Sequence, residues 1–272
     1  MSSLKISIVT PTLNAGPCLL ECIESVRNNR DAGVRLEHII VDGGSTDGTV
    51  ELAQSMGARV MVGKDSGIFD AINRGSFAAD GDLLGFLGAD DTLLPGAAKT
   101  IGDFYVPRAH RWITGGVKWT GPDGELLADV SAPPAWLGSR MFASLGWCCI
   151  WHMATFVSKD FFRELGGFDI KFRDAGDYEF FARALQAQRF GRVPSPLASY
   201  RRTGLNNSSL PANQERIRRE CESVAQKYGP SSARTRSVYR SLLKIWVNAG
   251  NPGWFRYKHL PSASAPRARD LS

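Results

Sequence analysis

Two adjacent carboxylates, Asp90 and Asp91, directly follow an uncharged run from Leu83 to Ala89. Neighbouring like charges in an apolar setting repel and shift each other's pKa, so a fold usually keeps such a pair for a reason. Magnesium or manganese takes one or two carboxylate oxygens from a protein and its other ligands from water and a substrate diphosphate. The pair therefore indicates a divalent cation site that would stabilise charge on a leaving phosphate. A surface turn is the alternative interpretation.

Two further stretches place an aspartate just after an expected strand. The stretch VDGGSTDGT, residues 41–49, has Asp42 before a Gly-Gly turn, and KDSGIFDAINRG, residues 64–75, begins with Lys64 and Asp65. A carboxylate at a strand end can accept hydrogen bonds from a nucleobase N–H or from ribose hydroxyls. A capped strand-to-helix turn is the other interpretation of the first stretch. Neither stretch is a G-x-G-x-x-G fingerprint or a G-x-x-x-x-G-K loop, which disfavours a dinucleotide cofactor or an ATPase.

The first hundred residues alternate short β-branched runs with amphipathic segments, the pattern of β-α-β units and a mostly parallel sheet. The expected strands span residues 5–14, 36–45, 58–63 and 82–89, and the expected helices span residues 16–29, 47–56 and 67–79. Open α/β sheets bind ligands at the carboxyl edge of their strands. We therefore expect Asp42, Asp65 and the Asp90–Asp91 pair to meet at that edge of an α/β domain.

The regular pattern weakens after a helix that runs from Pro95 to about Tyr105. A hairpin is expected over residues 111–127 and further helices over 158–169 and from about Asp177 to 188. Residues 141–158 contain no Asp, Glu, Lys or Arg, but their Gly, Ser, Thr and His content favours a buried strand and loop over a membrane-spanning helix. Two basic helices are expected over 213–229 and 236–250, and residues 261–272 are predicted to be disordered.

The charge is distributed unevenly along the 272 residues, whose net charge is +6. Residues 201–272 hold 14 Lys and Arg against 4 Asp and Glu, so a basic tail follows an acidic body. Such a tail suits anionic lipid, polyphosphate or nucleic acid, or it is a solvated helical face. The five cysteines form no C-x-x-C pair and the N-terminus has too short an apolar segment for a signal peptide, which together favour a reducing cytosol.

Taken together, the motifs resemble the inverting nucleotide-sugar glycosyltransferases of family 2. The resemblance covers residues 4–204 and rests on SIVTPTLN, VDGGSTDGT, DSGIFDAINRG, FLGADD, HMATFVSKDFFRELGGFD and AGDYEFFAR, which occur in the order of the family. It implies the GT-A fold, an α/β fold with a mostly parallel central sheet flanked by helices. It divides the chain into a catalytic domain, residues 1–204, and a basic helical C-terminal extension, residues 205–272. The spacing within SGIFDAINRG is similar to that of the bacterial branch that makes exopolysaccharide, capsule or O-antigen.

The resemblance also implies a donor site. By position, the residues against the nucleotide are Thr10, Pro11, Thr12, Asp42 and Asp65, with Asp42 on the base or ribose. The D-x-D metal motif of the family corresponds to Ala89-Asp90-Asp91, in which Ala89 replaces the first acid. Asp91 is therefore the expected ligand of Mn²⁺ or Mg²⁺, and Asp90 the expected contact to the sugar or ribose.

The family's general base corresponds to Asp177, which would take the proton of the attacking hydroxyl. Asp174 and Glu179 are rival candidates, and a mere helix cap is the alternative role for Asp177. His152 is similar to a family histidine near the acceptor or diphosphate, although a core histidine is also an open interpretation. Arg201 and Arg202 match basic residues that close over the diphosphate; a solvated loop is the competing interpretation.

The implied reaction moves a sugar from a nucleoside-diphosphate donor, most often UDP-linked, to a hydroxyl of a saccharide or lipid-linked acceptor. A non-catalytic nucleotide-sugar-binding protein and a sugar nucleotidyltransferase are the alternatives. The chain is expected in the cytoplasm, peripheral at the membrane if the tail inserts Trp246, Trp254 and Phe255 into an anionic surface. Otherwise the tail packs on the catalytic domain or on a second subunit in a homodimer. Nucleic acid is not a predicted partner.

Overall fold

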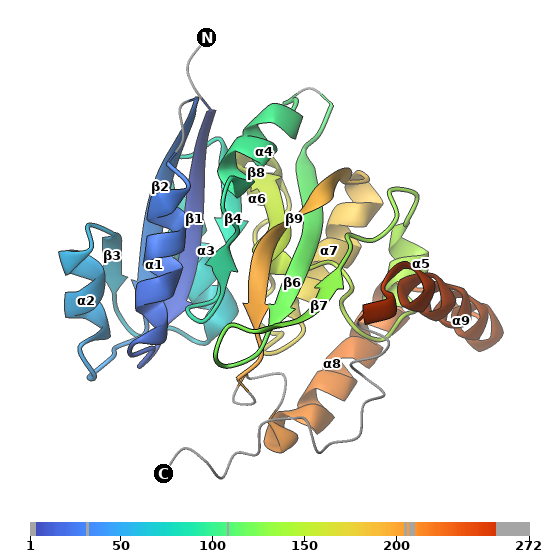
Figure 1. The fold of residues 1–272 in the computed structure, drawn as a ribbon. Coiled ribbons are helices and arrows are strands. Elements are labelled where there is room, and N and C mark those ends of the chain that lie inside the picture. Colours follow the sequence, from blue (N-terminus) through green and yellow to red (C-terminus); the bar gives the residue numbers. More distant parts are fainter. Residues whose placement is uncertain (1–3, 31–32, 108, 204–205, 207–209, 254–272) are drawn as a thin grey trace.

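The computed structural model describes residues 4–30, 33–107, 109–203, 206 and 210–253. Among these residues, nine strands form one sheet in the order β3-β2-β1-β4-β8-β6-β9-β5, with β7 paired to β6 (Figure 1). The strands are β1 (Leu4–Thr12), β2 (Val34–Asp42), β3 (Arg59–Val62), β4 (Leu83–Phe86), β5 (Thr92–Leu93), β6 (Trp112–Thr120), β7 (Leu126–Val130), β8 (Thr155–Ser158) and β9 (Gly191–Arg201).

The two halves of the sheet differ in strand direction. In the first half β1 pairs in parallel with β2 and β4, and β2 pairs in parallel with β3, which confirms the predicted β-α-β units. In the second half β8 is antiparallel to β4 and β6, the predicted hairpin forms between β6 and β7, and β9 runs parallel to β6. The parallel half brings the carboxyl ends of β1, β2 and β4 to one edge, as the sequence predicted.

Helices cover both faces of the sheet. They are α1 (Cys18–Asn28), α2 (Thr49–Ser55), α3 (Ile68–Ala78), α4 (Ala97–Phe104), α5 (Ser139–Ala143), α6 (Lys159–Glu164), α7 (Gly176–Ala187), α8 (Pro211–Tyr228) and α9 (Ala233–Gly250), with a 3₁₀ turn η1 (His152–Ala154). One core cluster joins the sheet to α1, α2 and α4. The other joins it to α3, α5, α6, α7 and α8 (Figure 1). Each sheet face is thus buried by its own helical layer, as expected for an α/β domain.

The uncharged stretch 141–158 forms the end of α5, a loop, η1 and the buried strand β8, so the predicted strand and loop are confirmed. No helix in the described part of the chain is long and apolar enough to cross a membrane. All five cysteines are free thiols.

The tail helices α8 and α9 pack against the α/β domain. Cys221, Val224 and Tyr228 of α8 belong to the core cluster of α7. On α9, Val247 is buried in the other cluster and Trp246 packs beside it. Predictions were also made for Trp254, Phe255 and residues 261–272. These residues lie outside the described part of the chain.

Candidate active site

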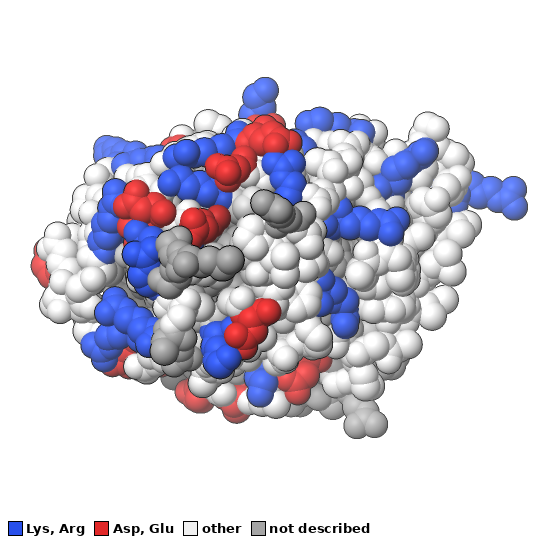
Figure 2. Space-filling model, turned by 90° about the horizontal axis from the view of Figure 1, so that it is seen from above, with Lys and Arg blue, Asp and Glu red and all other residues white. Residues whose placement is uncertain are grey.

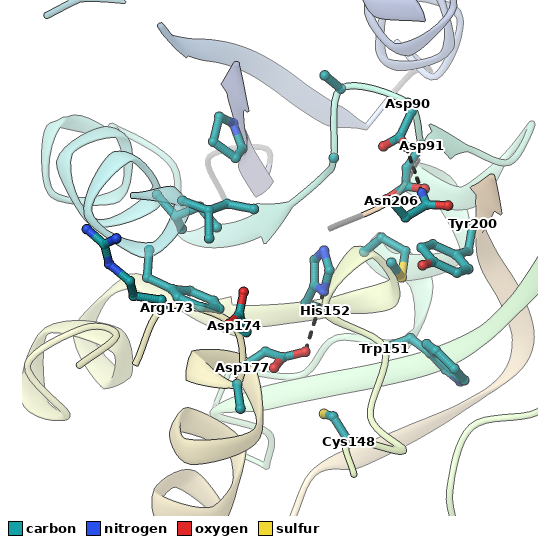
Figure 3. Close-up of a pocket in the computed structure, with 18 of the residues that line it drawn as sticks. Asp90, Asp91, Cys148, Trp151, His152, Arg173, Asp174, Asp177, Tyr200 and Asn206 are labelled. Atoms are coloured by element: carbon teal, nitrogen blue, oxygen red, sulfur yellow. Dashed lines mark hydrogen bonds and ion pairs between the residues drawn. The ribbon is translucent and has the colours of Figure 1, made fainter. Parts of the chain in front are cut away.

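A cavity of about 710 Å³ opens at the carboxyl edge of the parallel strands (Figure 3). Its walls come from the ends of β1 and β4, from η1, from the first turn of α7 and from α8. Six residues predicted from the sequence line it: Pro11, Thr12, Asp90, Asp91, His152 and Asp177. Five others do not: Thr10, Asp42, Asp65, Arg201 and Arg202.

The Asp90–Asp91 pair follows β4 after three residues, Leu87 to Ala89, at the predicted edge. Asn206 donates from Nδ2 to Asp90 Oδ2 at 2.9 Å, and the backbone N–H of Arg201 donates to Asp91 Oδ1 at 3.1 Å. Asp91 is only 3% exposed. Burial, reinforced by the neighbouring charge of Asp90, raises the pKa of Asp91 to about 7, and burial also raises the pKa of Asp90. Two crowded carboxylates with raised pKa values favour a cation or a proton between them.

The oxygens of this pair fit a hard divalent cation. A Cβ atom added to Gly88 would stand 2.7 Å from Asp91 Oδ2 and 3.0 Å from Asp90 Oδ1, so one oxygen of each carboxylate points at the same small space. Among the described residues, no group of three or more His, Cys, Asp or Glu side chains could hold a metal ion. The protein therefore offers two carboxylates, the number that Mg²⁺ commonly takes when water and phosphate complete its shell.

Asp177 lies across the cavity from this pair, in the first turn of α7. Its Oδ1 accepts a hydrogen bond from the N–H of Tyr178 at 2.7 Å, and its Oδ2 lies 3.7 Å from His152 Nδ1. The cap residue of α7 is Ala175, so Asp177 is not the N-cap. Its carboxylate instead faces the imidazole inside the cavity (Figure 3).

His152 stands between Asp177 and the Asp90–Asp91 pair (Figure 3). Burial alone would lower the pKa of His152, but the carboxylate of Asp177, aided by the charges of Asp91 and Asp90, raises it. The imidazole is therefore disposed to carry a positive charge among three carboxylates. Its ring lines the cavity and has acidic groups on two sides, so it is not enclosed in an apolar core.

The two rivals of Asp177 each form ion pairs with other side chains. Glu179 is 1% exposed and binds Arg183 Nη2 at 2.7 Å and the Tyr228 hydroxyl at 2.5 Å. The side chain of Asp174 is 2% exposed; Asp174 also lines the cavity, but its carboxylate forms an ion pair with Arg216 of α8, with Arg216 Nη2 at 3.1 Å from Oδ1. These partners leave Asp177 as the best placed of the three to accept a proton in the cavity.

Thr10, a predicted nucleotide contact, faces away from the cavity. Thr10 is buried, with its hydroxyl 2.9 Å from His38 Nε2 and 3.8 Å from Cys22 Sγ. The prediction for Thr10 is corrected on this point, because β1 turns this side chain toward the core. Only the next residues, Pro11 and Thr12, reach the cavity.

Asp42 builds the loop after β2. Gly44 N and Ser45 N donate to its Oδ1 at 2.9 and 2.8 Å, and Ser45 Oγ and Thr12 Oγ1 donate to its Oδ2 at 2.5 and 3.0 Å. Burial would raise the pKa of Asp42, but these hydrogen bonds outweigh it and lower the pKa. A carboxylate accepts about four hydrogen bonds. A contact to a base or ribose, as predicted, would therefore require one of these bonds to break.

Asp65 lies beside that same loop. Its Oδ1 accepts from the N–H of Gly67 at 3.0 Å, and its Oδ2 would be 2.9 Å from a Cβ atom on Gly43. The absence of a side chain at Gly43 thus makes room for the Asp65 carboxylate. Asp65 is at the predicted edge, next to the cavity but not in its wall.

The two predicted arginines also point elsewhere. The Arg201 guanidinium forms an ion pair with Glu21 of α1, while the Arg202 guanidinium lies 5.0 Å from the ring centre of Trp119. Neither side chain lines the cavity, because each has found a partner on the neighbouring surface. A diphosphate contact would require Arg201 to leave Glu21.

The sequence did not reveal the contribution of the tail. Ile217 and Cys221 of α8 line the cavity, and Glu220 of the same helix accepts hydrogen bonds from the backbone before Asp177. Asn206, which binds Asp90, was also missed. A basic helix was expected over residues 213–229, but no spacing in a sequence indicates which distant loop a helix will cover.

Comparisons of the sequence with known proteins find glycosyltransferases. The family model "Glycosyl transferase family 2" matches residues 7–105. A PGL/p-HBAD biosynthesis glycosyltransferase of Mycobacterium tuberculosis is 31% identical over 198 residues, covering 66% of this chain and 69% of that protein. An uncharacterized glycosyltransferase of the same species is 29% identical over 223 residues, covering 78% and 80%.

Solved structures share the fold. Residues 1–349 of S. aureus TarS in complex with UDP-GlcNAc superpose with a TM-score of 0.62 at 16% identity, covering 90% of this chain and 73% of that one. A mannosyltransferase from Pyrobaculum calidifontis in complex with GDP-Man and Mn²⁺ gives a TM-score of 0.55 at 17% identity, covering 93% and 73%. The predicted GT-A fold is therefore confirmed. The chain belongs to glycosyl transferase family 2.

Proposed function

We propose that this chain is an inverting, metal-dependent glycosyltransferase that uses a nucleoside-diphosphate sugar, UDP-linked in the first instance. It transfers the sugar to a hydroxyl of a saccharide or lipid-linked acceptor during cell-surface polysaccharide synthesis. The observation that carries the proposal is the arrangement of one cavity, with Asp90 and Asp91 at one end, Asp177 at the other and His152 between them.

The donor end would hold the nucleotide and the sugar. Pro11 and Thr12 line the nucleotide side of the cavity, Asp90 would contact the sugar or ribose, and Asp91 would bind Mn²⁺ or Mg²⁺. A bound cation would stabilise the negative charge of the departing diphosphate. Proteins of the same fold support the class of donor, since the structure of TarS contains UDP-GlcNAc and that of the Pyrobaculum mannosyltransferase contains GDP-Man and Mn²⁺.

Asp177 would act as the general base. It accepts the proton of the acceptor hydroxyl while that oxygen forms a bond to the anomeric carbon. The bond from the anomeric carbon to the phosphate oxygen breaks on the opposite face, and its electron pair leaves with the nucleoside diphosphate. One displacement of this kind inverts the anomeric configuration. The separate positions of Asp177 and the Asp90–Asp91 pair suit a reaction in which attack and departure occur on opposite faces.

His152 would hold a positive charge between the two ends. A protonated imidazole beside Asp177 would orient that carboxylate and face the phosphate oxygens that gain charge. Arg201 becomes a second diphosphate contact only if it exchanges Glu21 for phosphate, a partner that guanidinium binds in a fork.

The tail supplies a surface for an anionic membrane. Val238, Leu242 and Ile245 recur on one side of α9 and are 51%, 51% and 67% exposed. Residues 233–250 include four Lys and Arg and no Asp or Glu. Figure 2 shows Lys and Arg but no Asp or Glu at the right-hand end of the molecule, where α9 lies in Figure 1. A basic helix with an exposed apolar stripe can lie in a lipid interface. We therefore assign the membrane contact predicted for Trp246 to this stripe, because Trp246 packs on the domain.

The decisive experiment for the proposed function is a donor screen with Mn²⁺ that follows both donor hydrolysis and transfer. We expect one nucleotide sugar to raise the melting temperature and to release its nucleoside diphosphate, with the product anomer inverted by NMR. Binding without turnover would favour the non-catalytic alternative, and release of pyrophosphate would favour a nucleotidyltransferase. The proposal fails if no nucleotide sugar is bound or hydrolysed.

A further inference from the structure

One carboxylate of the C-terminal helix α8 holds the backbone that leads to Asp177. Glu220 Oε1 accepts a hydrogen bond from Arg173 N at 2.8 Å, and its Oε2 accepts from Asp174 N at 2.9 Å and from Ala175 N at 2.8 Å. Three successive N–H groups that point at one anion form a nest, a concave and electropositive site. Asp177 follows only two residues after this nest.

Helix α7 begins without a capping side chain of its own. Its cap residue is Ala175, whose side chain makes no hydrogen bond to the first turn. A carboxylate near a helix N-terminus is favoured by the helix dipole and by the N–H groups that lack partners there. Glu220 supplies that carboxylate from a helix about 45 residues further along the chain.

The other side of the same turn is closely packed. A Cβ atom on Gly176 would lie 2.6 Å from Phe69 Cδ2 of α3, so the backbone there touches the aromatic ring. The turn before Asp177 is thus held between Phe69 and Glu220. Nearby, Arg216, one turn before Glu220 on α8, forms an ion pair with Asp174 and adds a second contact to the same turn.

We infer that Glu220 is a positioning residue for Asp177, and that α8 is therefore part of the active site. This inference rests on the proposed function, in which Asp177 is the general base. A displacement of about 1 Å in a catalytic group can cost about 100-fold in rate. Without these three hydrogen bonds the turn could shift. Asp177 would then move relative to His152, whose Nδ1 lies 3.7 Å from Asp177 Oδ2.

Tyr228 provides a matched control on the same pair of helices. Its hydroxyl donates to Glu179 Oε1 at 2.5 Å, so it also fastens α8 to α7, but Glu179 does not line the cavity. Tyr228→Phe removes that bond and keeps the ring. Glu222, an exposed residue that accepts from Arg218 within α8, gives a second control as Glu222→Ala.

The test measures transfer kinetics, melting temperature and amide hydrogen exchange at residues 173–175 in four variants of the full chain. We expect Glu220→Ala to lower kcat by about 10- to 100-fold with an unchanged donor KM, while Tyr228→Phe and Glu222→Ala stay within about twofold. Glu220→Gln retains one acceptor oxygen and nearly the same volume, so its loss should be smaller and its fold intact. The three amides should exchange faster in Glu220→Ala and not in Tyr228→Phe.

Two kinetic outcomes would overturn the inference: a folded Glu220→Ala or Glu220→Gln with unchanged kcat, or a Tyr228→Phe that loses as much kcat as Glu220→Ala. The second outcome would mean that α8 acts only through general docking. If the wild type transfers no sugar, the proposed function fails by itself. Amide hydrogen exchange still tests the contact between Glu220 and the turn in that case, because unchanged exchange at the three amides in Glu220→Ala would refute this contact.

Discussion

The two ends of the cavity are held in place in different ways. At the donor end, the loops after β1 and β2 bond to each other, as when Asn14 Oδ1 accepts from Thr46 N at 2.9 Å and Asp42 accepts from Thr12. At the base end, the turn before Asp177 gives three N–H groups to Glu220 of the C-terminal helix. The nucleotide loops of the donor end are therefore held within the first β-α-β region, and its Asp90–Asp91 pair is bound by Arg201 N at the end of β9 and by Asn206 beyond it. The turn of the base end, in contrast, is held by a carboxylate of α8. Changes at the first should affect donor binding, and changes at the second should affect the chemical step.

The largest expected effect is that of Asp177→Asn. Asparagine has nearly the same shape but cannot take a proton from the acceptor hydroxyl, so kcat for transfer should fall by about 10²- to 10⁴-fold. Donor binding, read as the increase in melting temperature with donor and Mn²⁺, should stay as in the wild type. Transfer is measured as release of nucleoside diphosphate that depends on the acceptor.

Glu179→Gln is the control for that prediction. Glu179 is buried against Arg183 and Tyr228, so its neutralisation should lower the melting temperature and leave kcat nearly unchanged. A loss of kcat in Glu179→Gln as large as in Asp177→Asn, at a temperature where both are folded, would contradict the assignment of the base.

The next largest effect is expected at the donor end, for Asp91→Asn. Removal of the buried carboxylate should lower kcat/KM by about 100-fold and abolish the stimulation by Mn²⁺. A chelator should have the same effect on the wild type and none on the variant. Asp90→Asn should raise the donor KM but retain the response to Mn²⁺. If both variants respond to Mn²⁺ as the wild type does, Asp91 is not the metal ligand.

A smaller effect is expected for Gly43→Ala, which tests whether Asp65 serves the donor end. The added methyl group would stand 2.9 Å from Asp65 Oδ2 and would move this carboxylate away from its place. Loss of one hydrogen bond to a charged group corresponds to about a tenfold rise in the donor KM. The kcat value should not change, since the base end is untouched. An unaltered donor KM would remove Asp65 from the donor site.

The same contrast explains what could be predicted from the sequence. The first four strands alternate with their helices, and each carboxylate of the donor end lies at or within a few residues of the end of its strand, so the location of Asp90 and Asp91 was predictable. The direction of each side chain was not. Whether Thr10 faces the cavity or His38 depends on the pleat of β1, and whether Arg201 faces a phosphate or Glu21 depends on the packing of β9 against α1.

The base end was predictable only in part. The motif AGDYEFF placed Asp177 near a helix start, but it also offered Asp174 and Glu179. The choice among them follows from partners on α8, namely Arg216 and Tyr228, that come about 40 to 50 residues later. Contacts over such distances arise from tertiary packing and leave no local pattern in the chain. Packing of the tail on the domain was one of two expectations, but for the same reason the sequence did not indicate that α8 would form part of the cavity wall.

The smallest expected effect concerns stability and again separates the two ends. His38, which lies under the donor end, is buried, and burial, with a smaller contribution from Arg30, lowers its pKa from 6.5 to about 3. A group with a lowered pKa stabilises the fold above its unfolded value, so this contribution is present above pH 6.5 and is lost as the pH falls toward 3. At the base end, burial would raise the pKa of Glu179, but bonds from Arg183 and Tyr228 lower it below 4.5, so its contribution is lost only below that pH.

Between pH 6.5 and 4.5, His38 should therefore lower the stability as the pH falls, and Glu179 should contribute no slope. Asp91, whose pKa is raised to about 7, should contribute a slope of the opposite sign, so the contribution of His38 is read from the difference between variant and wild type. The expected slope from His38 is up to about 1.4 kcal/mol per pH unit. Urea unfolding at several pH values should show that His38→Gln reduces the slope in this window. Thr10→Val, which removes the hydrogen bond to His38 but keeps the imidazole, should retain it. An equal slope in His38→Gln and the wild type would mean that the acid sensitivity arises elsewhere. A reduced slope in Glu179→Gln above pH 4.5 would mean that the acid sensitivity arises at Glu179 instead.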